Sequence, residues 1–346
     1  MAEQAEEQAA ERAPGRPVTS VDVARLAGVS RATVSHILNH QVQRFTPRTV
    51  ERVLAAAAEL GYVKSAAARA LALGHSDIVI LVVPDTTLSN LQDVIEAVSA
   101  QLQDLGFATV VHFAGPQGAA SGTAGLTALV DMLRPAGVLD LGEAVPPEQA
   151  ERLRASGAVV VAEYGVREAG PMSDGNVLIG RLQAEHLVAQ GYRRLAYASL
   201  DDGRRDPWGR DRAAGVAALC AELGLDPPAH LEVPLDRAGA REAVRTLVGG
   251  DGPALGVACF SDDVAIAVLA GAREVGVEVP GQVGIIGFAG SPVGQLVAPR
   301  LTSLAADVDA GVAFISSRLA SVYGLEVDGA QRPAAEVFEV VQGGTT

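Results

Sequence analysis

The chain has 346 residues, 49% of them hydrophobic, so two or three domains with substantial cores are expected, and the formal net charge of −14 by itself argues against nucleic-acid binding. A membrane protein is excluded, because the aliphatic block that begins at Ile78 ends at Pro84, far short of the roughly 20 residues of a transmembrane helix. Cys220 and Cys259 match no metal or redox spacing, and the polar N-terminus lacks the apolar core of a signal peptide, so we expect a cytoplasmic protein with free thiols.

The charge is distributed unevenly along the chain. Residues 1–15 carry a net charge of −3 and residues 16–75 a net charge of +5, which leaves −16 on the rest of the chain. A basic block joined to an acidic body is typical of a small nucleic-acid-binding module on a larger domain that does not bind nucleic acid. We expect residues 1–17 to be a disordered acidic tail.

Two short helices separated by a glycine are predicted in the basic block. Ser20 is the expected N-cap of the first helix, and Gly28 is expected to end it, because glycine tolerates the left-handed backbone of a tight turn. Ser30 is the expected N-cap of a second helix over residues 31–38. Such a pair can cross at a steep angle, as in a helix-turn-helix, or form an ordinary helical hairpin. The outer face of the second helix, where a DNA major groove can receive it, carries Arg31, Thr33, Ser35 and His36.

A third helix is predicted from its start signal and its apolar stripe. Thr46 is the expected cap, Pro47 takes the first helical position, and Gly61 ends the helix. The apolar stripe consists of Val50, Val53, Leu54, Ala57 and Leu60. The alanine-rich residues 62–77 that follow are too few for a stable isolated helix, so we expect them to be helical only when held by a partner.

Three segments of this region together resemble the DNA-binding head and hinge of the LacI/GalR family of transcriptional regulators. They read VTSVDVARLAGVSRATVSHILN, FTPRTVERVLAAAAELGY and SAAARALALG. The resemblance implies a helix-turn-helix DNA-binding domain over residues 18–63 and a hinge helix over residues 64–76. It also implies a homodimer on a near-palindromic double-stranded DNA operator, with the second helices in the major groove and the hinge helices in the minor groove.

The same resemblance implies DNA contacts at particular residues. Arg31 and Ala32 match the two positions that select bases, and an arginine there can pair with guanine through two hydrogen bonds. His36 matches a base-facing position that is more often arginine, and Leu71 matches the hinge leucine that wedges between base pairs. The positions that match phosphate contacts or helix caps are Thr19, Ser30, Thr33, Ser35, Asn39 and Thr49. For Ser30 and Thr46 a role as a helix cap alone is an alternative at least as strong as a DNA contact.

From Ile78 onward, short aliphatic runs alternate with helical patterns. The runs predict buried parallel strands at residues 78–83, 107–113, 137–141, 158–162, 194–200, 231–235, 254–260 and 283–288. Two series of about four strands predict an α/β body of two doubly wound lobes over residues 77–346. The fold class is therefore an all-α helix-turn-helix head plus this α/β body. The family resemblance likewise implies a periplasmic-binding-protein-like body for dimerisation and effector binding, with the last helices crossing back.

Two residues of the body match positions at which the family binds its effector. Arg212 matches an arginine that a helix presents to the effector, and Asp263 matches a position that often binds ligand hydroxyl groups. A structural ion pair between these two side chains is an equal alternative.

Other positions depart from the family pattern. Ala289 and Gly290 stand where the family commonly has two aspartates, and residues 86–91 replace an asparagine-proline-aromatic step. A sugar site needs carboxylates and amides for the hydroxyl groups and an aromatic face for the ring. We therefore hypothesise that the effector is not a typical free sugar, or that the protein acts without an effector.

No catalytic or metal-binding pattern stands out. The six histidines are scattered, and the glycine-rich residues 115–125, which we expect to be a surface loop, lack the Gly-Lys-Ser/Thr of a phosphate-binding loop. The sequence predicts no catalytic residue, no metal and no cofactor. It predicts a sequence-specific DNA-binding transcriptional regulator, a repressor, and the alternative is an enzyme or small-molecule-binding α/β protein with an incidental helical head.

Overall fold

The computed structural model divides the chain into two compact units, Met1–Ser76 and Asp77–Thr346. The part of the chain that it describes comprises residues 18–38, 42–62, 70, 73–86, 91–115, 120–142, 145–162, 175–201, 208–248, 252–328 and 337–346. The predicted acidic tail lies outside these residues, as does most of the predicted hinge.

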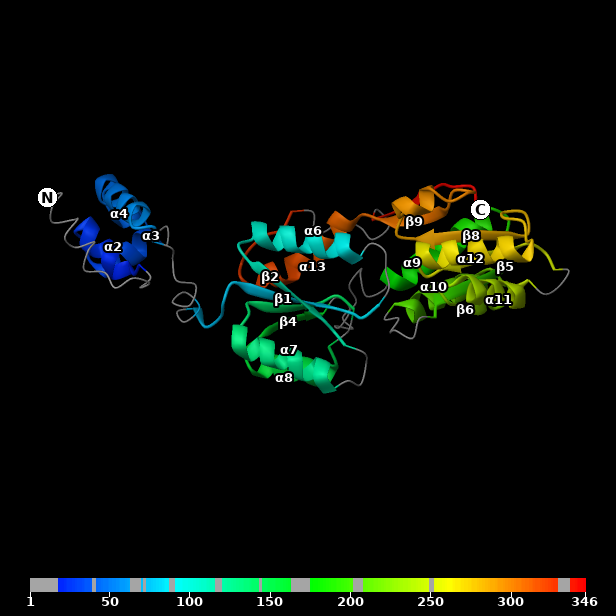
Figure 1. The fold of residues 1–346 in the computed structure, drawn as a ribbon, viewed down its shortest axis with the longest axis horizontal. Helices are drawn as coiled ribbons and strands as arrows, with labels where there is room; N and C mark the ends of the chain where they lie inside the picture. The colour runs from blue at the N-terminus through cyan, green and yellow to red at the C-terminus, as the bar shows by residue number, and fades with distance from the viewer. Residues whose placement is uncertain are drawn as a thin grey trace. The chain divides into compact units, whose positions relative to one another are not determined.

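The first unit contains the three predicted helices of the head (Figure 1). They are α2 (Ser20–Ala27), α3 (Arg31–Leu38) and α4 (Pro47–Glu59), and a short 3-10 helix, η1 (Val42–Arg44), precedes α4. Their inward faces meet in a cluster of small and β-branched side chains, namely Val23, Ala24, Ala27, Val34, Ile37, Val53, Ala56 and Ala57. The predicted helical head is confirmed.

The structure corrects two of the predictions made for the helices of the head, one on the N-cap of α2 and one on the apolar stripe of α4. Gly28 adopts the predicted left-handed conformation, with φ 63° and ψ 39°. The N-cap of α2 is Thr19 and not Ser20, since the backbone N–H and the hydroxyl group of Thr19 both donate to the carboxylate of Asp22, at 2.9 and 2.7 Å. Leu54 is 50% exposed, because it lies one position beyond the inward face that Val53 occupies.

The first sheet of the second unit is parallel, in the order β2-β1-β3-β4. Its strands are β1 (Ile78–Val83), β2 (Ala108–Phe113), β3 (Gly137–Asp140) and β4 (Val159–Ala162), and its helices are α6 (Leu91–Asp104), α7 (Ala120–Leu133) and α8 (Pro147–Ala155). Alternate residues of β1 point to opposite faces: Val79 and Leu81 pack with α6, whereas Ile80 and Val82 pack with α7 and α8. The sheet is therefore covered by helices on both faces, as predicted.

Two predictions in this sheet are wrong. Strand β2 is an edge strand and not a buried one, and its Phe113 is 64% exposed. Residues 120–125, which we expected in a loop because of their glycines, form the beginning of α7.

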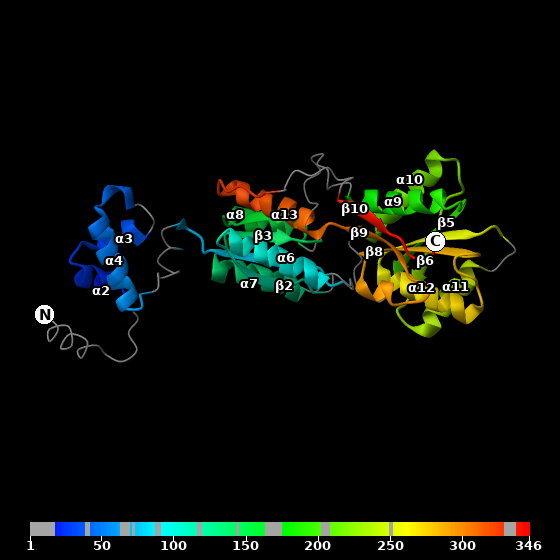
Figure 2. The same cartoon turned by 90° about the horizontal axis from the view of Figure 1, so that it is seen from above.

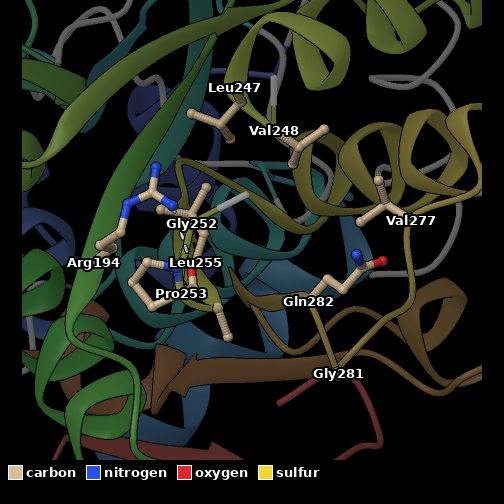
Figure 3. A pocket seen from close by; sticks show the side chains of 10 residues that line it. Arg194, Leu247, Val248, Gly252, Pro253, Leu255, Val277, Gly281 and Gln282 are labelled. Atoms are coloured by element: carbon tan, nitrogen blue, oxygen red, sulfur yellow. Dashed lines mark hydrogen bonds between the residues drawn. The ribbon is translucent and has the colours of Figure 1, made fainter. Parts of the chain in front are cut away.

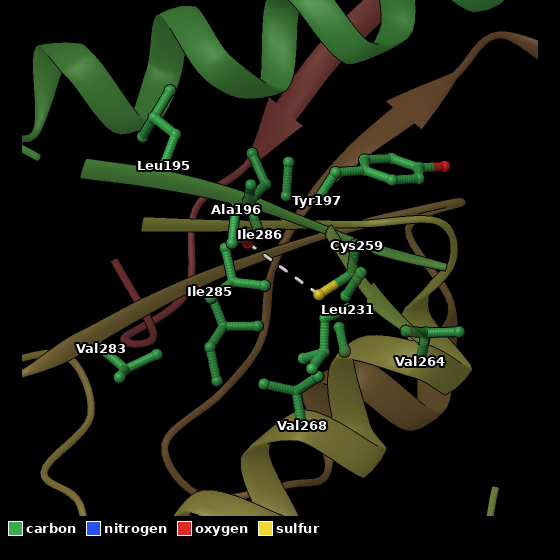
Figure 4. Packing of buried hydrophobic residues seen from close by; sticks show 14 of the residues in the cluster. Leu195, Ala196, Tyr197, Leu231, Cys259, Val264, Val268, Val283, Ile285 and Ile286 are labelled. Carbon is green, nitrogen blue, oxygen red and sulfur yellow. Dashed lines mark hydrogen bonds between the residues drawn. The ribbon is translucent and has the colours of Figure 1, made fainter. Parts of the chain in front are cut away.

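The second sheet has the order β10-β9-β8-β7-β5-β6, and only β10 is antiparallel to its neighbour among these strands. The strands are β5 (Arg194–Leu200), β6 (Ala229–Val233), β7 (Leu255–Cys259), β8 (Val283–Phe288), β9 (Thr302–Ala306) and β10 (Phe338–Val341). The helices α9 (Gly175–Ala189) and α10 (Gly209–Glu222) cover one face, and α11 (Arg237–Leu247) and α12 (Asp262–Val275) cover the other (Figure 2). A large hydrophobic core packs against both faces of this sheet (Figure 4).

The second sheet differs from the prediction in three of its strands. The strands β9 and β10 were not predicted, and β6 ends at Val233 because the next residue, Pro234, has no N–H to donate to a neighbouring strand. After β9 the chain returns to the first sheet, where α13 (Val308–Val322) packs against α6 and the hydroxyl group of Tyr323 donates to the carbonyl of Ala136 at 2.5 Å. This return agrees with the crossing back that the resemblance implied. No helix among the described residues is long and apolar enough to cross a membrane.

Candidate nucleic-acid interface and effector site

Within the first unit, the outer face of α3 is exposed to solvent. Val34 and Ile37 face the core, and the 3.6-residue period of the helix therefore turns the residues on the opposite side of α3 outward. The exposed side chains are those of Arg31, Ala32, Ser35 and His36, and that of Thr33 is half-buried. The four residues predicted on the outer face, Arg31, Thr33, Ser35 and His36, are thus exposed or half-buried, and Ala32, a predicted base contact, is exposed beside them.

The hydroxyl groups predicted at the helix starts act as caps. The N–H of Thr33 donates to the hydroxyl oxygen of Ser30 at 3.1 Å, and the N–H of Thr49 donates to the hydroxyl oxygen of Thr46 at 3.3 Å. A capping hydroxyl satisfies one of the helix donors that would otherwise have no partner. The capping role of Ser30 is therefore confirmed, and its phosphate contact stays a prediction.

Two predicted DNA contacts, Asn39 and Leu71, lie outside the described residues. Conversely, two exposed arginines that the sequence analysis did not single out, Arg44 and Arg48, flank the capped N-terminus of α4. The helix dipole is positive at the N-terminus, so positive side chains beside it add to a positive potential that attracts phosphate groups. The net charge of residues 16–75 includes both arginines, but a net charge does not show that they lie at the same end of one helix.

Arg212 lies buried at the carboxyl edge of the second sheet, in the first turn of α10, and is only 3% exposed. Its Nε donates to Oδ1 of Asn176 at 2.9 Å, and its Nη1 donates to the carbonyl of Phe260 at 2.6 Å. The guanidinium carbon lies 4.8 Å from the ring centroid of Phe260 and 4.2 Å from that of Phe288. Aromatic faces attract a cation, so the rings help to hold this charge away from water.

A close contact between two helices places Arg212. A Cβ atom at Gly180 of α9 would overlap the carbonyl oxygen of Arg212, and a Cβ atom at Gly215 of α10 would overlap the carbonyl oxygen of Val177. The two backbones therefore touch where the glycines face each other. This contact lies within the first two turns of α9 and α10, and it brings Asn176 to Arg212.

The second predicted effector residue, Asp263, is half-buried in the first turn of α12, directly after β7. Its neighbour Asp262, which no sequence pattern indicated as an effector contact, is fully buried. Asp262 accepts a hydrogen bond from the N–H of Ser291 at 2.5 Å and another from the hydroxyl group of Ser303 at 2.6 Å. Burial raises the pKa of Asp262, and these two hydrogen bonds oppose that rise.

Asp262 shapes the loop that follows β8. Ser303, which it binds, accepts a hydrogen bond from the N–H of Gly290 at 3.0 Å. In this loop Ala289 has φ 122° and Gly290 has φ 65°, and the first value is unfavourable for a residue with a Cβ atom. The loop in which the family commonly carries two aspartates is here a tightly bonded turn with small side chains.

A cavity of about 240 Å³ lies at the other edge of the second sheet (Figure 3). Arg194 and Leu255, at the amino ends of β5 and β7, contribute to its lining together with aliphatic side chains such as Leu247 and Val277. The Nη1 atom of Arg194 donates to the carbonyl of Pro253 at 3.1 Å. Across the residues that the structure describes, no group of three or more histidine, cysteine, aspartate or glutamate side chains could hold a metal ion.

Comparisons with known proteins agree with this arrangement. The family model "Bacterial regulatory proteins, lacI family" matches residues 20–65, and the model "Periplasmic binding protein-like domain" matches residues 184–346. The chain is 31% identical over 311 residues to the HTH-type transcriptional regulator GntR of Pseudomonas aeruginosa, with 85% of each chain covered. It is 29% identical over 347 residues to the HTH-type transcriptional regulator MalR of Streptomyces coelicolor, with 94% of this chain and 95% of the other covered.

A solved structure of similar fold is that of the Lac repressor dimer bound to operator and the anti-inducer ONPF. It matches with a TM-score of 0.73 at 21% identity and covers 96% of this chain and 99% of that chain. This likeness confirms the predicted fold class. Both sequence relatives are named as HTH-type transcriptional regulators, which favours the predicted regulator over the alternative of an enzyme or small-molecule-binding protein with an incidental helical head.

Proposed function

This chain belongs to the LacI family of bacterial regulatory proteins and is a DNA-binding transcriptional regulator, and we propose that it is a repressor that binds a near-palindromic operator as a homodimer. The observation that carries this proposal is the exposed outer face of α3, set on a closed three-helix core within a basic segment. In this proposal Arg31 and Ala32 select bases, and His36 faces the bases beside them. Thr19, Ser30, Thr33, Ser35, Asn39 and Thr49 contact phosphates, and Leu71 wedges into the minor groove.

An exposed apolar surface on the second unit supports the homodimer. Leu296 is 84% exposed and Val293 is 58% exposed, and both lie in or next to the 3-10 helix η2 (Pro292–Gln295). Exposed apolar side chains that lie together on a surface can mark a protein–protein contact. A second copy of the chain would cover them, and two copies would present two heads to the two halves of an inverted repeat.

The test of DNA recognition is selection of bound fragments from random duplex, followed by binding measurements on the selected site. We expect an inverted repeat, and we expect its affinity to fall steeply with rising salt because arginine contacts displace counterions from phosphates. Arg31→Ala should relax the preference for one base pair in each half-site, at a cost of ~1–3 kcal/mol for the preferred base pair.

Arg25→Ala is the matched control for this test, since it removes the same charge from the outer side of α2. We expect it to change affinity for all sequences alike and to leave the base preference intact. A uniform loss with Arg31→Ala would mean that Arg31 contacts a phosphate. A protein that binds no inverted repeat better than random duplex at low salt would contradict the proposed function.

We also propose that the effector, where one acts, contacts Arg212 and Asp263 at the carboxyl edge of the second sheet and is not a typical free sugar. Two observations support this proposal. Ala289 and Gly290 offer no carboxylate, and both oxygens of the nearby Asp262 already accept hydrogen bonds from the protein. A sugar's hydroxyl groups would therefore find fewer carboxylate acceptors there than the family pattern provides.

Titration calorimetry with a panel of monosaccharides and disaccharides tests the effector proposal. We expect no binding heat at micromolar concentrations, because the departures from the family pattern remove polar partners that a sugar needs. Micromolar binding of any neutral sugar would overturn this proposal while leaving the proposed DNA recognition intact.

A further inference from the structure

One hydrogen bond joins the beginnings of the two helices of the helix-turn-helix. The Nε atom of Arg31, the first residue of α3, donates to the hydroxyl oxygen of Ser20, the first residue of α2, at 3.3 Å. Thr19 and Asp22 already form the capping bonds of α2. The hydroxyl group of Ser20 is therefore not needed as a cap and serves to hold Arg31.

The atom that Ser20 binds determines which nitrogens of Arg31 face outward. A guanidinium group has five N–H bonds, one on Nε and four on the two terminal nitrogens. With Nε held by Ser20, the two terminal nitrogens form a pair of parallel donors at the exposed end of the side chain. Guanine offers two acceptors of matching spacing, O6 and N7, in the major groove.

We propose that Ser20 is a positioning residue for base recognition, which holds Arg31 so that its two terminal nitrogens meet O6 and N7 of one guanine in each operator half-site. This inference rests on the proposed function, in which Arg31 selects a base. A free arginine side chain loses much rotational freedom when it binds, and a side chain that is already held loses less. Ser20 therefore favours the one arrangement that reads guanine over the many that contact a phosphate.

This role differs from that of a general DNA contact. The hydroxyl group of Ser20 carries no charge, so its removal should not change the number of counterions released on binding. Without Ser20, the Nε of Arg31 is free, and the side chain can approach guanine from the side or turn toward a phosphate. The loss should therefore be a loss of discrimination at one base pair and not a loss of affinity for all DNA.

The experiment measures affinities of the full chain for the selected operator and for its single-base variants at every half-site position. The proteins are the wild type, Ser20→Ala, Ser20→Thr, Arg31→Ala and the Ser20→Ala/Arg31→Ala double variant. Ser20→Ala should lower the preference for guanine at the Arg31 position by about two- to tenfold, the range of one net hydrogen bond. Ser20→Thr, which keeps the hydroxyl group, should restore most of that preference.

Two further results are required by this inference. Ser20→Ala should have no added effect in the Arg31→Ala background, and the slope of affinity against salt should stay that of the wild type. Gln43→Ala is the control, since it removes an exposed, uncharged polar side chain from η1, to which no DNA contact is assigned, and it should leave the preference at the Arg31 position unchanged. Thermal melts followed by circular dichroism check that all variants fold alike.

The outcomes separate this inference from the function on which it rests. A wild-type protein with no preferred inverted repeat would contradict the proposed function itself. If the wild type prefers guanine and Arg31→Ala removes that preference while Ser20→Ala does not alter it, only the positioning role is overturned. An equal effect of Ser20→Ala with and without Arg31 would likewise overturn it, because Ser20 would then act independently of Arg31.

Discussion

Gly180→Ala is expected to destabilise the second unit by about 3 kcal/mol, a large change for one methyl group, because the new Cβ atom would overlap the carbonyl oxygen of Arg212. In an exposed helix the same substitution would stabilise by about 1 kcal/mol, since alanine is the better helix former. Here the overlapping atom is backbone, which cannot move aside as a flexible side chain can, so α9 and α10 must separate. Urea denaturation followed by circular dichroism measures the change.

Gly311→Ala is the control for this prediction. Gly311 lies in α13, and a Cβ atom there would meet no atom within 4 Å. We expect this variant to be more stable than the wild type by about 0.5–1 kcal/mol. Gly215→Ala should behave like Gly180→Ala, because its Cβ atom would overlap the carbonyl oxygen of Val177 from the other side of the same contact. Equal stability of the Gly180 and Gly311 variants would show that the two helices do not touch.

The head could be predicted from the sequence because its signals are local. Gly28 ends α2 through its own backbone conformation, and Thr46 and Pro47 mark the start of α4 within four residues of chain. The assignment of Ser20 as the cap failed because Thr19 and Ser20 are both good capping residues. The carboxylate of Asp22, three residues after Thr19, decides between them.

Most strands of the body that could be predicted contain a run of apolar residues, such as IVILVV in β1 and VGIIGF in β8. Strand β9 reads TSLAA and lacks such a run, and β10 is a short edge strand that is antiparallel to β9. The position of an edge strand depends on pairing between distant parts of the chain, which no local pattern reports. The alternation of strands and helices therefore predicted the fold class but not the full width of the second sheet.

The effector site shows the same limit at the level of single residues. Asp262 and Asp263 are adjacent in the sequence, yet one is fully buried and the other is half-buried. The difference arises from partners that lie far along the chain: Ser291 and Ser303 bind Asp262, and Gly287 leaves room for its carboxylate. Arg212 was found by resemblance, but nothing near it in the sequence shows that Phe288 would lie against its guanidinium group.

Arg212→Ala is expected to destabilise the second unit by about 3 kcal/mol or more, because the guanidinium group is a structural part of this edge of the sheet. Its removal would leave Oδ1 of Asn176 and the carbonyl oxygen of Phe260 without their present donor in a buried place. A buried polar group that loses its hydrogen bond costs about 1–3 kcal/mol, and a cavity between the aromatic rings adds to this. The free energy of unfolding in urea measures the loss.

Two further substitutions show whether the loss arises from the guanidinium group. Arg210→Ala removes an exposed arginine from the same helix and should change the stability by less than about 0.5 kcal/mol. Arg212→Lys keeps the charge, but its single nitrogen cannot reproduce the planar pair of bonds to Asn176 and Phe260, so we expect an intermediate loss. If Arg212→Ala were as stable as Arg210→Ala, the guanidinium group would have to face solvent, free to meet an effector without first breaking bonds within the protein.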